Sequence, residues 1–196
     1  MHSQHYADSV KLNTQFQENN KKWAGKSVGG YASYIRDVVK EHNALTLLDY
    51  GCGKGIQYIC LNKYKGSDIA QTFDQYLGVS DVYKYDPCVS SYSQPPDSDQ
   101  TFDAVILTQV LPFIPDDDIK WVKELLMSYT NKFCFIGNYD PVRPVKDAKQ
   151  ALMNPEHFRV NRTMDWYYDQ FADWSGSALY WNFKVDENTR VFKRSH

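Results

Sequence analysis

The segment Leu47-Leu48-Asp49-Tyr50-Gly51-Cys52-Gly53-Lys54-Gly55 joins an apolar run to three closely spaced glycines. It continues the run Ala44 to Tyr50 (ALTLLDY), which is short and mostly apolar, as is typical of a buried parallel strand. Three glycines at alternate positions then lead into a predicted helix around Gln57 to Leu61. Glycine is needed where the chain turns through positive φ or where a ligand touches the backbone. We therefore expect a ligand-binding loop at the carboxyl end of a parallel strand, where open α/β sheets bind their ligands.

Three further runs have the same buried-strand character: Asp81 to Tyr85 (DVYKY), Ala104 to Thr108 (AVILT) and Lys132 to Gly137 (KFCFIG). Between the last two, the segment Ile119 to Tyr129 carries apolar residues at helical spacing. Asp116 to Asp118 precede it, and acidic residues favour the start of a helix. Strands that alternate with helices predict a Rossmann-like α/β fold, with a mostly parallel sheet, helices on both faces and right-handed crossovers.

The two ends of the chain differ from this centre. Residues 1–25 are polar with scattered aromatics and indicate a weak helix or a flap, whereas Val28 to Glu41 has apolar residues at helical spacing. Asn43 lies just beyond and is a plausible C-terminal cap. Near the other end, Ala178 to Val185 and Thr189 to Lys193 predict an antiparallel hairpin. We expect one structural domain, with a helical lead-in or lid over 1–43 and a ligand-binding part over 44–196.

Size, charge and cysteine usage narrow the class of protein. A chain of 196 residues suits one domain, because single cores stop growing at roughly 250 to 300 residues. Its net charge of -2 does not support nucleic-acid binding, which usually requires a strongly basic surface. No apolar run approaches the ~18 residues that a membrane span needs. We expect a protein of the cytoplasm that does not enter the membrane.

The four cysteines contain no CxxC pair, so we expect no metal site and no disulfide framework, which favours a reducing compartment. Cys60 and Cys134 lie in apolar runs and are predicted to be buried thiols.

The chemistry of the glycine loop indicates its ligand. Dinucleotide-binding loops have the spacing GxGxxG, and here Ile56 stands where the third glycine belongs. The GxxxxGK[ST] sequence of phosphate-binding loops is absent as well. Asp49 would repel a phosphate but suits a ligand with a positively charged amino group. S-adenosylmethionine carries both an ammonium and a sulfonium.

The sequence LLDYGCGKG resembles motif I (D/E-x-G-x-G-x-G) of the class I S-adenosylmethionine-dependent methyltransferases. The resemblance implies that S-adenosylmethionine is the cofactor. It assigns cofactor binding to residues of this motif, namely Asp49, Tyr50, Gly51, Cys52, Gly53 and Gly55. The alternative is a glycine-rich turn without a ligand, because such turns also join strands to helices in other proteins.

Two later segments extend the resemblance through Gly137. Val82 to Pro87 resembles the second strand of the family, whose terminal acidic residue binds the ribose hydroxyls, which implies this role for Asp86 beside Pro87. The alternative for Asp86 is a simple turn residue. Thr101 to Pro115 resembles the fourth strand, which implies that Leu107, Thr108 and Gln109 line the methionine end of the cofactor and that Asp103 is structural.

The chain also departs from the family pattern. About sixteen positions separate Asp86 from Phe102, too few for the usual helix and third strand, so we expect that strand to be missing or shortened. We expect the insertion at Asn62 to Ser80 to re-cover part of the exposed edge, and the Ser90 to Thr101 loop to supply the contact with adenine. Pro112-Phe113 stands where many members have Glu-His, so no acid–base role carries over from that position.

Candidates for a catalytic role are Tyr139, Asp140 and His157. His157 precedes the aromatic cluster Trp166-Tyr167-Tyr168, which is similar to a small, mostly bacterial and phage subset of the family with unassigned acceptors. The alternatives are a hydrogen-bonded loop histidine and an aromatic core. A base is needed only if the acceptor must lose a proton, since the cofactor carries the hard chemistry.

The resemblance implies methyl transfer, and we expect a small-molecule acceptor. The alternatives are a cofactor-binding module or partner protein without activity, and a different reaction of the same cofactor, such as lysis.

Overall fold

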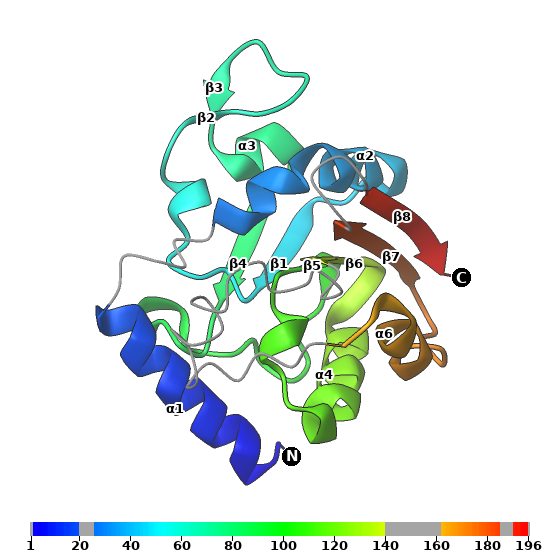
Figure 1. Cartoon of the computed structure of the whole chain (residues 1–196). Helices are drawn as coiled ribbons and strands as arrows, with labels where there is room; N and C mark the ends of the chain where they lie inside the picture. The colour runs from blue at the N-terminus through cyan, green and yellow to red at the C-terminus, as the bar shows by residue number, and fades with distance from the viewer. Residues whose placement is uncertain (1, 20–25, 140–161, 185–189, 196) are drawn as a thin grey trace.

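The computed structural model describes residues 2–19, 26–139, 162–184 and 190–195. Its centre is a six-stranded sheet with the order β4-β1-β5-β6-β7-β8 (Figure 1). The strands are β1 (Thr46–Tyr50), β4 (Asp81–Tyr85), β5 (Phe102–Thr108), β6 (Thr130–Tyr139), β7 (Ala178–Lys184) and β8 (Arg190–Ser195). Neighbouring strands are parallel up to β7, and β8 runs antiparallel to β7. The predicted α/β fold with a closing antiparallel pair is confirmed.

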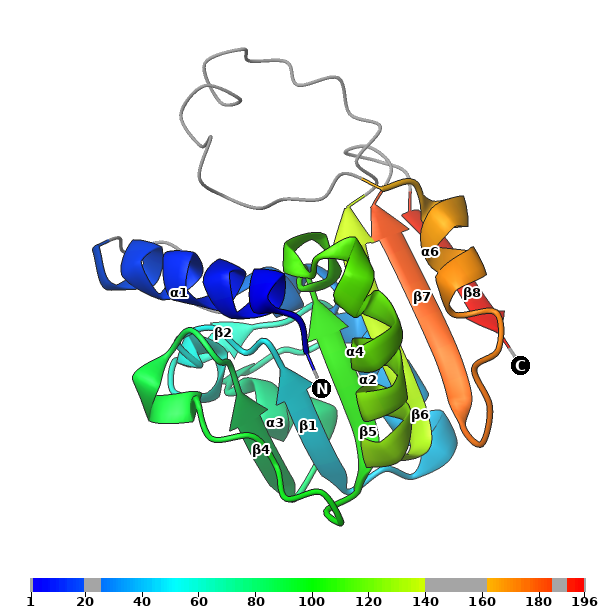
Figure 2. The ribbon, with the colours of Figure 1, turned by 90° about the horizontal axis from the view of Figure 1, so that it is seen from below.

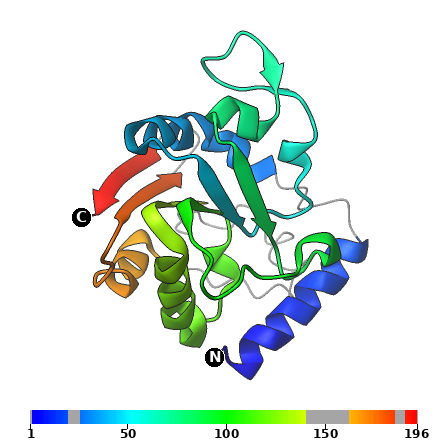
Figure 3. The ribbon, with the colours of Figure 1, turned by 180° about the vertical axis from the view of Figure 1, so that it is seen from behind.

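Helices cover both faces of this sheet, as predicted (Figure 3). The α2 helix (Ala32–His42) and the short α3 helix (Phe73–Leu77) lie on one face, and α4 (Asp116–Tyr129) and α6 (Met164–Gln170) lie on the other. Side chains alternate between the two cores along each strand, so that Leu47 packs toward α2 and Leu48 toward α4. Each fully buried leucine of this kind contributes about 1.5 to 3 kcal/mol to folding.

The helix limits agree with the sequence signals. Asn43 adopts a left-handed conformation (φ 49°) and caps the C-terminus of α2. Asp116, Asp117 and Asp118 form the first turn of α4, where they face the positive end of the helix dipole.

The connections within the sheet create a topological switch point between β1 and β5. The chain passes from β1 to β4 on one side and then returns to β5 on the other side. The loops that follow β1 and β5 therefore run in opposite directions from neighbouring strands. Open α/β sheets bind ligands at such a switch point, beyond the carboxyl ends of the strands. The glycine loop at Gly51–Gly55 directly follows β1 at this place.

The third strand of the family pattern is missing, as the sequence predicts. Residues 87–101 form only a 3-10 turn, η3 (Ser90–Tyr92), so β4 is the edge of the sheet. Tyr83 on this edge donates its hydroxyl to the carbonyl oxygens of Gln94 and Pro95, each at 3.3 Å. The insertion before β4 contains a hairpin of β2 (Asn62–Lys63) and β3 (Ala70–Gln71), followed by α3, which contacts α2.

Two local predictions after the glycine loop were wrong. The helix expected around Gln57 to Leu61 is a single 3-10 turn, η2 (Ile56–Tyr58). Cys60 is exposed rather than buried, together with Ile59 and Leu61. The chain leaves the core at the end of η2 and enters the β2–β3 hairpin, so this short apolar run does not enter the core. Cys134 is fully buried, as predicted.

The N-terminal segment forms a 16-residue helix, α1 (Gln4–Asn19), which lies across the carboxyl end of the sheet (Figure 2). Its start is tied to α4, because the Ser3 amide and hydroxyl donate to the two carboxylate oxygens of Asp118 at 2.7 and 2.6 Å. A 3-10 turn, η1 (Lys26–Gly30), precedes α2. Within the described ranges, no helix is both long and apolar enough to cross a membrane.

Candidate functional site

The glycine loop adopts a conformation that other residues rarely tolerate. Gly51, Gly53 and Gly55 all have positive φ, at 85°, 58° and 64°. The amide groups of Gly51 and Cys52 both donate to the carbonyl oxygen of Tyr85, at 2.7 and 3.1 Å, which joins the loop to the end of β4. A Cβ atom on Gly51 would lie 2.3 Å from the side chain of Val110, which follows β5. The loop is therefore compressed between the ends of β4 and β5.

Asp49 is a buried carboxyl group at the end of β1, with an exposed fraction of 1%. Its Oδ2 atom accepts hydrogen bonds from Gln57 Nε2 at 3.0 Å and from the Tyr58 hydroxyl at 2.9 Å. Its Oδ1 atom is buried and has no hydrogen-bond partner. Burial raises the pKa of Asp49 to about 7, and the charge of Asp86 adds to this effect, while the bonds from Tyr58 and Gln57 oppose it. This carboxyl is thus prepared to receive a further donor or a cation.

Asp86 follows β4 and lies within the same cluster, with an exposed fraction of 7%. Its Oδ2 atom accepts from the Gly53 amide and its Oδ1 atom from the Cys88 amide, both at 2.9 Å. Burial raises the pKa of Asp86, and these two bonds together with one from the Gln17 side chain oppose the shift. The bond to Cys88 is that of a turn residue, whereas the bond to Gly53 joins Asp86 to the glycine loop. The structure thus shows Asp86 as a turn residue that is also joined to the glycine loop, and its role in ribose binding stays a prediction.

The residues predicted at the end of β5 differ in what they can offer a ligand. The side chain of Leu107 is fully buried in the core on the α4 face, so only its backbone can serve. The Thr108 hydroxyl lies 3.2 Å from that of Ser27. Gln109 has φ 64°, a left-handed conformation that is uncommon outside glycine, and its Nε2 atom donates to the Tyr31 hydroxyl at 2.6 Å. Such strained residues concentrate at functional sites.

Two other residues that the sequence predicts to bind the cofactor can also contact a ligand only through their backbone, because their side chains are buried. Tyr50 and Cys52 are both 1% exposed. The Tyr50 ring packs against that of Tyr85 at a centroid distance of 5.0 Å, and the Cys52 thiol donates to the carbonyl oxygen of Gly53. Burial raises the pKa of the Cys52 thiol.

A groove of about 550 Å³ opens beside Asp86, between α1, α4 and the loop that follows β4. Its walls are mainly rings, which include Tyr6, Tyr85, Trp121, Pro87, Pro95 and Pro96. None of its lining residues is Asp, Glu, Lys or Arg. The Ser90 to Thr101 loop, from which the sequence predicts an adenine contact, contributes to this groove.

Sequence reasoning missed the part that α1 takes in the site. Ser9, Asn13 and Gln17 are spaced four residues apart and are buried, although all three are polar. The Lys54 ammonium in the glycine loop donates to the backbone carbonyl oxygen of Gln17 at 3.1 Å. The sequence predicts a helical lead-in or lid over 1–43, but nothing in it marks these three residues as part of a site.

The predicted catalytic residues are only partly placed. Tyr139 ends β6, where its backbone pairs with that of Lys184, and its side chain lies outside the described part of the chain. Asp140 and His157 lie outside the described residues altogether. In the aromatic cluster on α6, Tyr167 is 1% exposed, which supports the core interpretation for that residue.

In the described part of the chain, no group of three or more His, Cys, Asp or Glu side chains is arranged to hold a metal ion. No family model matches the chain, and no curated protein and no solved structure shows significant similarity to it. The candidate site is therefore defined by the geometry of the loop, the two carboxyl groups and α1.

Proposed function

We propose that this chain binds S-adenosylmethionine at the switch point between β1 and β5 and transfers its methyl group to a small-molecule acceptor. One observation carries the proposal: two buried carboxyl groups, Asp49 and Asp86, flank one glycine loop of positive φ. Asp86 is bonded to that loop through Gly53, and Asp49 keeps a buried oxygen without a partner.

The chemistry of these groups suits the proposed cofactor. The unpartnered Oδ1 of Asp49 would accept from the ammonium of a bound amino acid. The two oxygens of Asp86 suit a vicinal diol such as that of ribose, once a protein donor gives way. The negative charges of these two carboxyl groups would repel a phosphate, so the site disfavours ligands that carry phosphate groups. The glycines allow the ligand to approach the backbone closely.

The residues of this chain would bind, orient and shield the ligand. S-adenosylmethionine itself supplies an activated methyl carbon. Asp49 would ionise as it receives the ammonium, and Asp86 would fix the ribose. The α1 helix would shield the ligand from water. The site would also hold the acceptor at near-attack distance from the methyl carbon, and such positioning is worth several kcal/mol in general.

A second candidate is a cofactor-binding module without catalytic activity. It is favoured by Pro112-Phe113, which stand where many members of the family have Glu-His, because this place offers no acid–base group. Binding of S-adenosylmethionine without turnover across a broad set of acceptors would support this candidate.

Calorimetry with S-adenosylmethionine and S-adenosylhomocysteine tests the proposal, with ATP as the control nucleotide. We expect both sulfur compounds to bind and ATP not to bind. Gly53→Val should abolish binding, because a branched side chain at φ 58° both strains and fills the loop. Gly78→Val is the matched control: Gly78 has φ 78°, with free space around its Cβ position, in the cap of α3. It introduces the same kind of strain but should leave binding intact.

Asp86→Ala should weaken binding by about 1 to 3 kcal/mol, through the loss of a charge-assisted hydrogen bond. Mass spectrometry then separates the reactions, since methyl transfer yields S-adenosylhomocysteine and lysis does not. If the unmodified chain bound neither sulfur compound, the proposed function would be wrong.

A further inference from the structure

The inner face of α1 is polar where a covering helix is normally apolar. Ser9, Asn13 and Gln17 have exposed fractions of 2%, 5% and 4%. Leaving a buried amide oxygen without a hydrogen bond costs about 1 to 3 kcal/mol. Leucine at positions 13 and 17 would avoid this cost, so packing of the helix alone does not explain its buried amide groups.

The hydrogen bonds of these side chains leave acceptor oxygens free. The Oε1 atom of Gln17 is buried and has no hydrogen-bond partner. As an amide oxygen it can only accept a hydrogen bond. Asn13 donates through Nδ2 to the Ser9 hydroxyl at 3.4 Å, and its Oδ1 atom is also buried without a partner.

The α1 helix lies against the loops at the carboxyl end of the sheet. Near its C-terminal end, the Gln17 carbonyl oxygen accepts from Lys54 of the glycine loop. In its middle, the Val10 carbonyl oxygen accepts from the thiol of Cys88, two residues beyond Asp86. Nearer its start, the Ser9 hydroxyl donates to the carbonyl oxygen of Phe113, beyond β5, at 3.3 Å. The helix thus spans the loops that follow β1, β4 and β5.

We propose that Asn13 and Gln17 are ligand-binding residues and that α1 forms the second wall of the nucleoside site. Their amide oxygens accept hydrogen bonds from hydroxyl or amino groups of the ligand, as does the free oxygen of Asp49. The site therefore selects a ligand rich in donors, and a ligand that carries only acceptors is excluded. This inference rests on the proposed function, because it concerns the same crevice.

The test compares Asn13→Leu and Gln17→Leu, made separately, with Lys11→Leu, an exposed position on the same helix. Thermal unfolding and calorimetry with S-adenosylhomocysteine are measured for each variant. We expect both inner-face variants to fold and to bind S-adenosylhomocysteine at least tenfold more weakly than the unmodified chain. Lys11→Leu should leave the affinity unchanged.

Hydrogen exchange on the unmodified chain provides a measurement that needs no variant. S-adenosylhomocysteine should slow amide exchange along residues 9–17. Unchanged exchange there, or inner-face variants that bind equally well or more tightly, would overturn the role of α1 while the proposed function stands. If the unmodified chain binds no S-adenosylhomocysteine, both proposals fall.

Discussion

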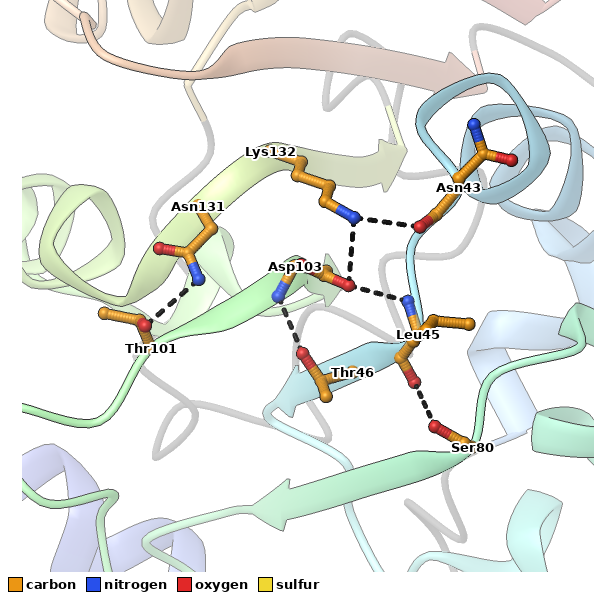
Figure 4. A network of polar contacts seen from close by, with 8 residues as sticks. All are labelled: Asn43, Leu45, Thr46, Ser80, Thr101, Asp103, Asn131 and Lys132. Carbon is orange, nitrogen blue, oxygen red and sulfur yellow. Dashed lines mark hydrogen bonds and ion pairs between the residues drawn. The ribbon is translucent and has the colours of Figure 1, made fainter.

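The carboxyl groups at the two ends of the sheet differ in their hydrogen-bond partners and in the direction in which their pKa is shifted. At the amino end, Asp103 lies in a closed network (Figure 4). Its Oδ2 atom accepts from the Leu45 amide at 2.8 Å and lies 3.2 Å from the Lys132 ammonium. Lys132 also donates to the carbonyl oxygen of Asn43, and the Asp103 amide donates to the Thr46 hydroxyl. Burial acts to raise the pKa of Asp103, but the bonds from Leu45 and Lys132 outweigh it and lower the pKa.

At the carboxyl end, no Lys or Arg side chain within the described residues bonds to Asp49, and one of its oxygens is unpartnered. Burial dominates there and raises its pKa to about 7. The amino end of the sheet thus satisfies its carboxyl group, whereas the carboxyl end retains an unsatisfied one at a cost in stability. Such a conflict with good packing is expected at functional sites.

Asp49→Asn should have the largest effect on stability of the substitutions at the two ends of the sheet. Below pH 3.8 the carboxyl is protonated in both folded and unfolded chains, and as the pH rises toward 7 only the unfolded chain releases the proton. Ionisation of Asp49 therefore lowers stability progressively across this window, by up to about 4 kcal/mol. The variant cannot ionise, so it should exceed the unmodified chain in stability at pH 8 and match it near pH 4.

Urea unfolding at pH 4.5, 6 and 8 measures this difference. A parallel pH dependence of the two proteins would show that Asp49 does not titrate with a raised pKa.

Asp103→Ala should act in the opposite direction and more weakly. It leaves the Leu45 amide and the Lys132 ammonium without their shared acceptor, which should cost about 1 to 3 kcal/mol of stability. Urea unfolding near pH 7 gives the loss, and calorimetry should find the affinity for S-adenosylhomocysteine unchanged. A change in affinity would contradict the separation of the two ends.

Lys132→Met should have the smallest effect, below about 1 kcal/mol, because the lysine side chain is 37% exposed and water screens the ion pair. The same unfolding experiment applies, with 0.5 M salt as the control. Added salt should lower the stability of the unmodified chain slightly toward that of the variant. A loss as large as that of Asp103→Ala would mean that the ion pair, rather than the amide bonds, holds this end together.

The sequence predicts the sheet well because its strands are buried on both faces. Leu47 and Leu48 face different cores, so both are apolar and β1 appears in the sequence as a mostly apolar run, which is typical of a buried strand. The exposed Cys60 shows the limit of this reasoning, since three apolar residues after a turn can as readily leave the core as enter it.

The sequence predicts residues of the candidate site only where they belong to a recognisable motif or strand end. Gly51 to Gly55 and Asp49 are contiguous, and Asp86 ends a recognisable strand. Asn13 and Gln17 approach the crevice through tertiary packing, more than thirty residues before the glycine loop. A polar helix at the N-terminus looks the same in the sequence whether it covers a ligand or faces solvent.

A crystal structure with S-adenosylhomocysteine tests the central claim most directly. We predict electron density for the nucleoside over Gly51–Gly55, with its diol on Asp86 and its ammonium on Asp49. A crevice that stayed filled by Gln17 and its neighbours at saturating ligand, with the nucleoside absent or bound elsewhere, would contradict the account.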